Sequence, residues 1–155
     1  MAEPRAIVIG IGNPQRGDDG AGRLAARLLR DALADAVEVV ELDGEATAVL
    51  ERLEGREFAY LIDACVSGAE SGNFRRFAAH EAPLPQLGSD LSTHGFGLAA
   101  AVELARNLGQ LPARTFVYAI EGARFEVGTG PSAAVAEAAR KVAAEIRSEL
   151  NQVLA

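Results

Sequence analysis

Several features that mark particular protein classes are scarce or missing in this chain of 155 residues. It has one cysteine, Cys65, which excludes an intrachain disulfide framework and fits a reducing compartment. No apolar run approaches the roughly 20 residues that a bilayer-spanning helix needs, and no signal-peptide pattern is present. We therefore expect a soluble, cytoplasmic protein with no membrane partner, folded as a single domain over residues 1–155.

Positive charge is also limited, since the formal net charge is −7 and Lys141 is the only lysine. Binding to a nucleic-acid backbone requires a basic surface, so no nucleic-acid partner is expected. The chain has no Walker A motif and no G-x-S-x-G nucleophile elbow. Counted from Gly10, the sixth position of a G-x-G-x-x-G dinucleotide fingerprint is Gln15, so that motif is missing too.

Short apolar runs alternate with segments of helical periodicity along the whole chain. Strands are predicted at 7–9, 37–42, 58–62, 74–79 and 116–120, and helices at 18–33, 47–54, 95–108 and 131–150. Alternating strands and helices indicate a mostly parallel sheet with helices on both faces. The predicted fold is α/β, a three-layer sandwich around a twisted sheet of about five strands.

Carboxylates follow two of the predicted strands. Asp18 and Asp19 come after the glycine-containing loop that ends the first strand, and Asp63 comes directly after the third. One aspartate of the pair is expected to cap the following helix, which leaves the other to face the crevice at the strand ends. If the first and third strands are neighbours, their ends lie ~5 Å apart. Two carboxylates that close repel unless a proton or a cation lies between them.

His94 is one of two histidines and stands at the start of a predicted helix. A helix N-terminus favours the neutral imidazole, which is the form that binds metals. Together with two carboxylates it would suit zinc, nickel or cobalt, with coordination positions left open. The alternative is that His94 only forms hydrogen bonds, and His80 is interpreted as structural. Cys65 has no candidate base nearby in sequence, so a buried, unreactive thiol is expected rather than a nucleophile.

Segments spread over nearly the whole chain together resemble the [NiFe]-hydrogenase maturation endopeptidases. They are G-I-G-N-P-x-x-x-D-D-G-x-G at 10–22, V-x-x-L-D-G at 39–44, Asp63-Ala64, S-T-H-G-F-G-L at 92–98, A-I-E-G-A-R-F at 119–125 and G-T-G-P at 128–131. Each motif alone is weak, but the set appears in order and at suitable spacing.

The resemblance implies that Asp19, Asp63 and His94 bind a metal and form the catalytic site. It implies a hydrolase that removes the carboxyl-terminal extension of a hydrogenase large-subunit precursor once nickel has been inserted. The nickel would be supplied by that precursor, so the isolated protein need hold none. Asp43 is the position that corresponds to a substrate-binding residue. The family's D-G-G-T stretch departs here to Asp43-Gly44-Glu45-Ala46-Thr47, so no role is carried over to Thr47.

Three other functions remain open at this stage. Peptidyl-tRNA hydrolases share the G-x-G-N-P opening, although this chain lacks their later T-R-H-N stretch and is acidic. A receiver-type signalling domain also has an acidic pair and a strand-end aspartate, but it needs a lysine after the last strand, and Lys141 lies deep in the final helix pattern. A metal-binding chaperone without hydrolytic activity would use the same three ligands.

Overall fold

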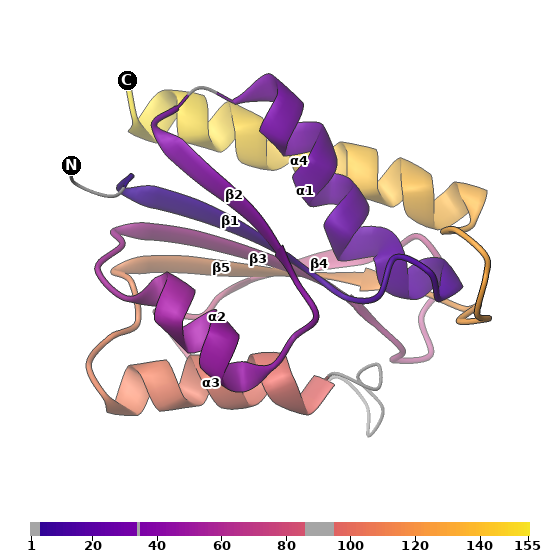
Figure 1. The fold of residues 1–155 in the computed structure, drawn as a ribbon, viewed down its shortest axis with the longest axis horizontal. Coiled ribbons are helices and arrows are strands. Elements are labelled where there is room, and N and C mark those ends of the chain that lie inside the picture. The colour runs from indigo at the N-terminus through magenta and orange to yellow at the C-terminus, as the bar shows by residue number, and fades with distance from the viewer. Residues whose placement is uncertain (1–3, 34, 86–94) are drawn as a thin grey trace.

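The computed structural model describes residues 4–33, 35–85 and 95–155. In this part of the chain a five-stranded sheet lies between two pairs of helices, α1 with α4 on one face and α2 with α3 on the other (Figure 1). The strands are β1 (Ala6–Ile11), β2 (Val37–Leu42), β3 (Phe58–Cys65), β4 (Phe74–Ala78) and β5 (Arg114–Glu121). The helices are α1 (Ala21–Ala32), α2 (Ala46–Leu53), α3 (Gly95–Asn107) and α4 (Ala133–Val153), with a short 3-10 helix, η1 (Gly17–Gly20), before α1. This arrangement confirms the predicted three-layer α/β sandwich.

The sheet has the order β2-β1-β3-β5-β4, and only the edge strand β4 runs antiparallel to its neighbour. β1 lies between β2 and β3. The chain therefore adds β2 on one side of β1 and then adds β3 on the other side, which makes β1 the point where the strand order reverses. In open α/β sheets, ligands bind at the carboxyl edge beside such a switch point. Gly10 of β1 pairs with Ile62 of β3, which confirms that the first and third strands are neighbours and brings their carboxyl ends together.

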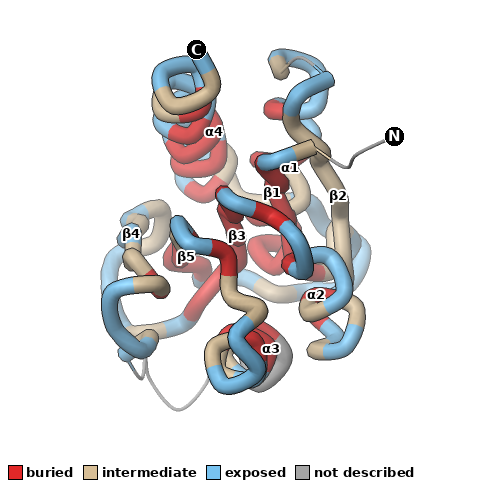
Figure 2. The backbone as a smooth tube through the Cα atoms, turned by 90° about the vertical axis from the view of Figure 1, so that its left-hand side faces the viewer, coloured by how far each residue is buried: buried red, intermediate tan, exposed pale blue. Residues whose placement is uncertain are grey.

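Side chains on β3 alternate between two cores. Tyr60 and Ile62 pack with α1 and α4, whereas Leu61 packs with α2 and α3. Asp63 continues this alternation, so it lies on the face that α3 covers. Figure 2 shows that β1, β3 and β5 form the buried centre, while β2 and β4 are partly exposed edges. No helix in the described ranges is long and apolar enough to cross a membrane.

Several element boundaries differ from the sequence-based prediction, and three of them bear on the site. β3 continues through Asp63 to Cys65 because its pairing with β5 extends to Cys65 and Glu121. Asp18 and the residue after it lie in η1, so α1 begins later than expected, at Ala21. α4 begins at Ala133 rather than at Pro131. Ser132 is its N-cap residue, and the Ser132 N–H donates to Asp18 Oδ1 at 2.8 Å; this bond from a distant segment helps to set where the helix starts.

Candidate functional site

Asp18 ties the loop after β1 to the loop after β5. Its side chain is fully buried, and its Oδ2 accepts hydrogen bonds from the N–H groups of Ala123 at 2.8 Å and Arg124 at 3.0 Å. Its Oδ1 accepts from Ser132. The expectation that one of the acidic pair caps its own helix is wrong, because no side chain caps η1 or α1. Burial opposes the charge of Asp18, but the three N–H donors outweigh it and lower the pKa of this carboxyl.

Asp19 lies over the end of β1. Its Oδ2 accepts from the N–H of Asn13 at 3.0 Å, and its carboxyl group is 1% exposed. Gly12 has a φ of 137° and faces Asp19 so closely that a Cβ at this position would overlap the Asp19 carbonyl oxygen. That Cβ would also lie 3.7 Å from the Asp19 carboxyl carbon. Gly12 is therefore needed both for its backbone conformation and for the close approach of Asp19 to the strand end.

Asp63 is the third buried carboxylate at this edge, with 4% exposure. Burial raises its pKa well above the usual range, and the nearby negative charge of Asp19 raises it further, while a hydrogen bond from the N–H of Ala64 at 2.8 Å opposes the shift. Asp19 and Asp63 are thus brought together as the topology predicts. A cation between them would favour the charged form of both groups.

The described residues include only part of the predicted site. His94 falls outside the described ranges, although the next residue in the chain, Gly95, begins α3. Within those ranges no group of three or more His, Cys, Asp or Glu side chains is arranged to hold a metal ion. Asp43 lies at the same edge after β2, where it is exposed and accepts a hydrogen bond from the N–H of Glu45 at 3.2 Å.

The two carboxylates are less accessible than a site with open coordination positions requires. Asp63 lines a cavity of about 30 Å³, which matches the volume of one water molecule. Leu84 and Pro85 line this cavity from the loop after β4, and Leu98 and Ala99 line it from the first turns of α3. Because this cavity is small, a ligand larger than a single small ion requires the residues around it to move.

Glu121 is a fourth buried carboxylate at the carboxyl edge, and the sequence marks it only as part of the A-I-E-G-A-R-F motif at 119–125. It is 4% exposed, and its carboxylate accepts from the hydroxyl and N–H of Ser67, from the N–H of Gly68 at 3.3 Å and from Cys65 Sγ at 3.5 Å. Its sequence signal is the same as that of Asp63: a carboxylate at the end of a buried apolar strand. These four donors stabilise the charged carboxylate of Glu121 without a cation.

Cys65 is positioned as an unreactive thiol, as the sequence predicts. Burial, followed by the negative charge of Glu121, raises the pKa of Cys65 to about 12, so the thiolate is scarce at neutral pH.

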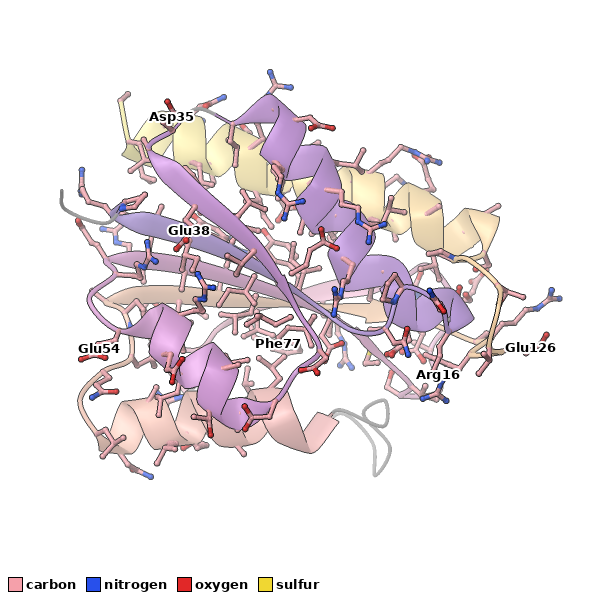
Figure 3. All side chains as sticks on the ribbon, in the orientation of Figure 1. Arg16, Asp35, Glu38, Glu54, Phe77 and Glu126 are labelled. Carbon is pink, nitrogen blue, oxygen red and sulfur yellow. The ribbon has the colours of Figure 1, made fainter. Side chains whose placement is uncertain are left out.

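The loops after β1 and β5 lie together at the carboxyl end of the sheet. Figure 3 places Arg16 and Glu126 at the end where the parallel strands finish, and Glu54 at the opposite end. Arg16 forms an isolated β-bridge with Val127, in the loop beside Glu126, so two loops pair with each other at this end.

His80 lies near the start of β5, where its Nδ1 accepts from the N–H of Thr115 at 3.1 Å. Its position agrees with a structural role.

Comparisons with known proteins point to one family. A family model described as HycI, hydrogenase maturation protease, matches residues 22–149. The hydrogenase maturating endopeptidase HybD from E. coli is similar in structure, with a TM-score of 0.80 and 24% identity over 96% of this chain and 93% of that one. The [NiFe] hydrogenase maturation protease HycI from Thermococcus kodakarensis KOD1 gives a TM-score of 0.70 and 25% identity over 95% and 92% of the two chains. No curated protein sequence matches this chain.

These matches bear on the functions that the sequence left open. The family model describes a protease, and the similar structures named above are endopeptidases or proteases. They give no support to a peptidyl-tRNA hydrolase, a receiver-type domain or a chaperone without hydrolytic activity. The resemblance read from the sequence motifs is confirmed.

Proposed function

The chain belongs to the hydrogenase maturation protease family, and from this membership we propose that it removes a carboxyl-terminal extension from the large-subunit precursor of a [NiFe]-hydrogenase. Its class of activity follows from the family: it is a peptide-bond hydrolase. A fold shared with a [NiFe] hydrogenase maturation protease supports the choice of substrate. The protein partner is that precursor, and the reaction takes place in the cytoplasm, where a free cysteine such as Cys65 stays reduced.

We assign Asp19, Asp63 and His94 to binding the nickel that the precursor carries. The observation that supports this is the pair of buried carboxylates, Asp19 and Asp63, at adjoining strand ends. The pKa of Asp63 is raised by burial and by the charge of Asp19, and a cation shared by the two carboxylates would relieve the repulsion between them. Nickel of the substrate would therefore lower this pKa and displace any proton held there.

Nickel held there would supply Lewis acidity next to the scissile peptide bond. Two routes remain compatible with the residues: polarisation of the peptide carbonyl, or a lowered pKa of an attacking water. In either route a carboxylate of the pair is placed to accept the proton that water loses. The three side chains also fix the position of the precursor, because they bind only a substrate that already holds its metal. Asp43, which is exposed at the same edge, contacts the precursor outside the metal site.

Because Asp63 is buried, binding of the precursor would require a local change of structure. Asp63 becomes accessible only when the residues around its cavity, which include Leu84 and Leu98, move aside. Docking of the precursor would provide the free energy for this movement. The same burial keeps bulk water from the carboxylates, where it strengthens their interaction with a bound cation.

The proposal is tested with the large-subunit precursor from the same organism, prepared with and without nickel. Mass spectrometry should show that the protein trims the carboxyl terminus of the nickel-loaded precursor and leaves the nickel-free precursor intact. Asp19→Asn should lower the rate on the loaded precursor at least about 1,000-fold. Glu54→Gln is the matched control, because it removes an exposed carboxylate at the opposite end of the sheet (Figure 3). Equal trimming of both precursors would contradict the role of nickel, and no trimming of either would contradict the activity.

A further inference from the structure

A second, larger cleft opens at the carboxyl edge beside the candidate site. Its volume is about 870 Å³, within the range of roughly 300–1,000 Å³ that ligand pockets have. The ends of β3 and β5 form its floor, the start of β4 and the turn before it form one wall, and α4 reaches its rim. The lining residues that matter here are Cys65, Ser67, Phe74, Arg75, Glu121 and Lys141.

The cleft adjoins the carboxylate pair. Pro85 and Ala119 line both this cleft and the small cavity next to Asp63. Cys65 follows Asp63 by two residues on β3, so both side chains are on the same face of the sheet, about 7 Å apart along the strand. A peptide in extended conformation covers that distance with about two residues. A chain cut beside Asp63 can therefore continue into the cleft.

The charges around the cleft favour an anionic ligand. Arg75 and Lys141 are exposed, and neither forms an ion pair with any other described residue. The Arg75 guanidinium lies over the Phe77 ring, 5.6 Å from its centre. Glu121 carries the opposite charge, but its carboxylate is already engaged by the hydroxyl, thiol and N–H donors described above. Both cations at this cleft therefore lack a carboxylate partner, although the protein has a net charge of −7.

We propose that this cleft binds the carboxyl-terminal extension of the precursor, and that Arg75 and Lys141 hold a carboxylate of that peptide. The inference rests on the proposed function, since it assigns the cleft to the segment that the cut releases. A cleft of this size accepts a short chain segment but not a folded domain. The extension is the part of such a substrate that is a free chain end, and it always finishes in an α-carboxylate, the group that two unpaired cations would recognise.

A synthetic peptide with the sequence of the extension provides a probe that needs neither nickel nor cleavage. Binding to the full-length protein is measured by calorimetry for the free-acid peptide, its C-terminal amide, and a free-acid version with any Asp or Glu replaced by Asn or Gln. We expect the wild type to lose at least fivefold in affinity with either the amide or the version lacking acidic side chains. The first result identifies the α-carboxylate as the recognised group, and the second identifies a side-chain carboxylate.

Two cleft variants and one control complete the test. Arg75→Gln and Lys141→Met should each weaken binding of the free acid about fivefold, as one exposed ion pair predicts, and the double variant should no longer distinguish the peptides. Arg140→Gln is the matched control, because Arg140 adjoins Lys141 on α4 but pairs with Glu137 outside the cleft. Failure of the wild type to bind the free acid, or wild-type affinities in the double variant, would overturn the inference.

Cleavage of the nickel-loaded precursor, measured in parallel, separates this inference from the proposed function. Both hold if the cleft variants raise KM about fivefold each while kcat stays within twofold. If the wild type cleaves and the double variant has an unchanged KM, the cleft assignment fails and the protease function stands. If no protein cleaves but the peptide preference depends on Arg75 and Lys141, the cleft still binds a peptide carboxylate and the proposed reaction is wrong.

Discussion

Asp63→Asn is expected to abolish cleavage and at the same time to stabilise the folded protein at neutral pH. Activity should fall at least about 1,000-fold, because the amide cannot act as an anionic ligand or accept a proton from water. Stability should rise because Asn keeps the size of Asp63 and accepts the hydrogen bond from the N–H of Ala64, but needs neither a buried charge nor a bound proton at this position. We expect a gain of about 0.5–2 kcal/mol in the free energy of unfolding.

The pH dependence of this gain identifies its cause. Burial and the charge of Asp19 raise the pKa of Asp63 above its unfolded value of 3.8. Between these two pKa values the folded protein holds a proton that the unfolded chain has released, so the stability contributed by this group falls as pH rises. The difference between Asp63→Asn and wild type should therefore be small near pH 4 and increase toward pH 8. Denaturant unfolding at several pH values measures it, with Asp31→Asn on the exposed side of α1 as control. A variant less stable than wild type at neutral pH would contradict this account.

The fold could be read from the sequence largely because the buried strands have a strong apolar signal. Residues 7–9 and 58–62 are continuous apolar or aromatic runs, and they form the neighbouring centre strands β1 and β3. Parallel strands end at one edge, so the approach of Asp19 to Asp63 follows from topology once these strands are recognised. The precise end of β3 did not follow, because it depends on pairing with β5, which is more than 50 residues away in the chain.

The division of work between Asp18 and Asp19 could not be predicted from the sequence. The two residues are adjacent and chemically identical, and local rules offer helix capping to either of them. The outcome is decided by the loop between β5 and α4, whose N–H groups at Ala123, Arg124 and Ser132 surround Asp18. These hydrogen bonds join residues more than 100 positions apart, so the sequence around Asp18 gives no sign of them. Glu121, in contrast, had the same visible signal as Asp63, so equal weight on every strand-end carboxylate would have found it.

Asp18→Ala is expected to destabilise the folded protein strongly. It removes the acceptor of three partly buried N–H groups, at Ala123, Arg124 and Ser132, and unsatisfied donors cost up to about 1–3 kcal/mol each before water relieves part of the penalty. We expect a loss of about 3–5 kcal/mol in the free energy of unfolding, which corresponds to a fall of roughly 10 °C in Tm for a domain of this size. Thermal unfolding followed by circular dichroism measures the change.

The neighbouring residue is the control that separates stability from chemistry. Asp19→Asn keeps an acceptor for the N–H of Asn13, so its Tm should stay within about 2 °C of wild type while cleavage is lost. The pH dependence gives a second check, since the N–H donors outweigh burial and lower the pKa of Asp18 below 3.8. Its stabilising effect is therefore present above that value and is lost as the pH falls through the lowered pKa. Wild type should lose stability in this acid range more steeply than Asp18→Ala does. If both substitutions gave the same loss of stability, the two adjacent carboxylates would share one structural role, and the assignment of Asp19 to the nickel of the substrate would have to be abandoned.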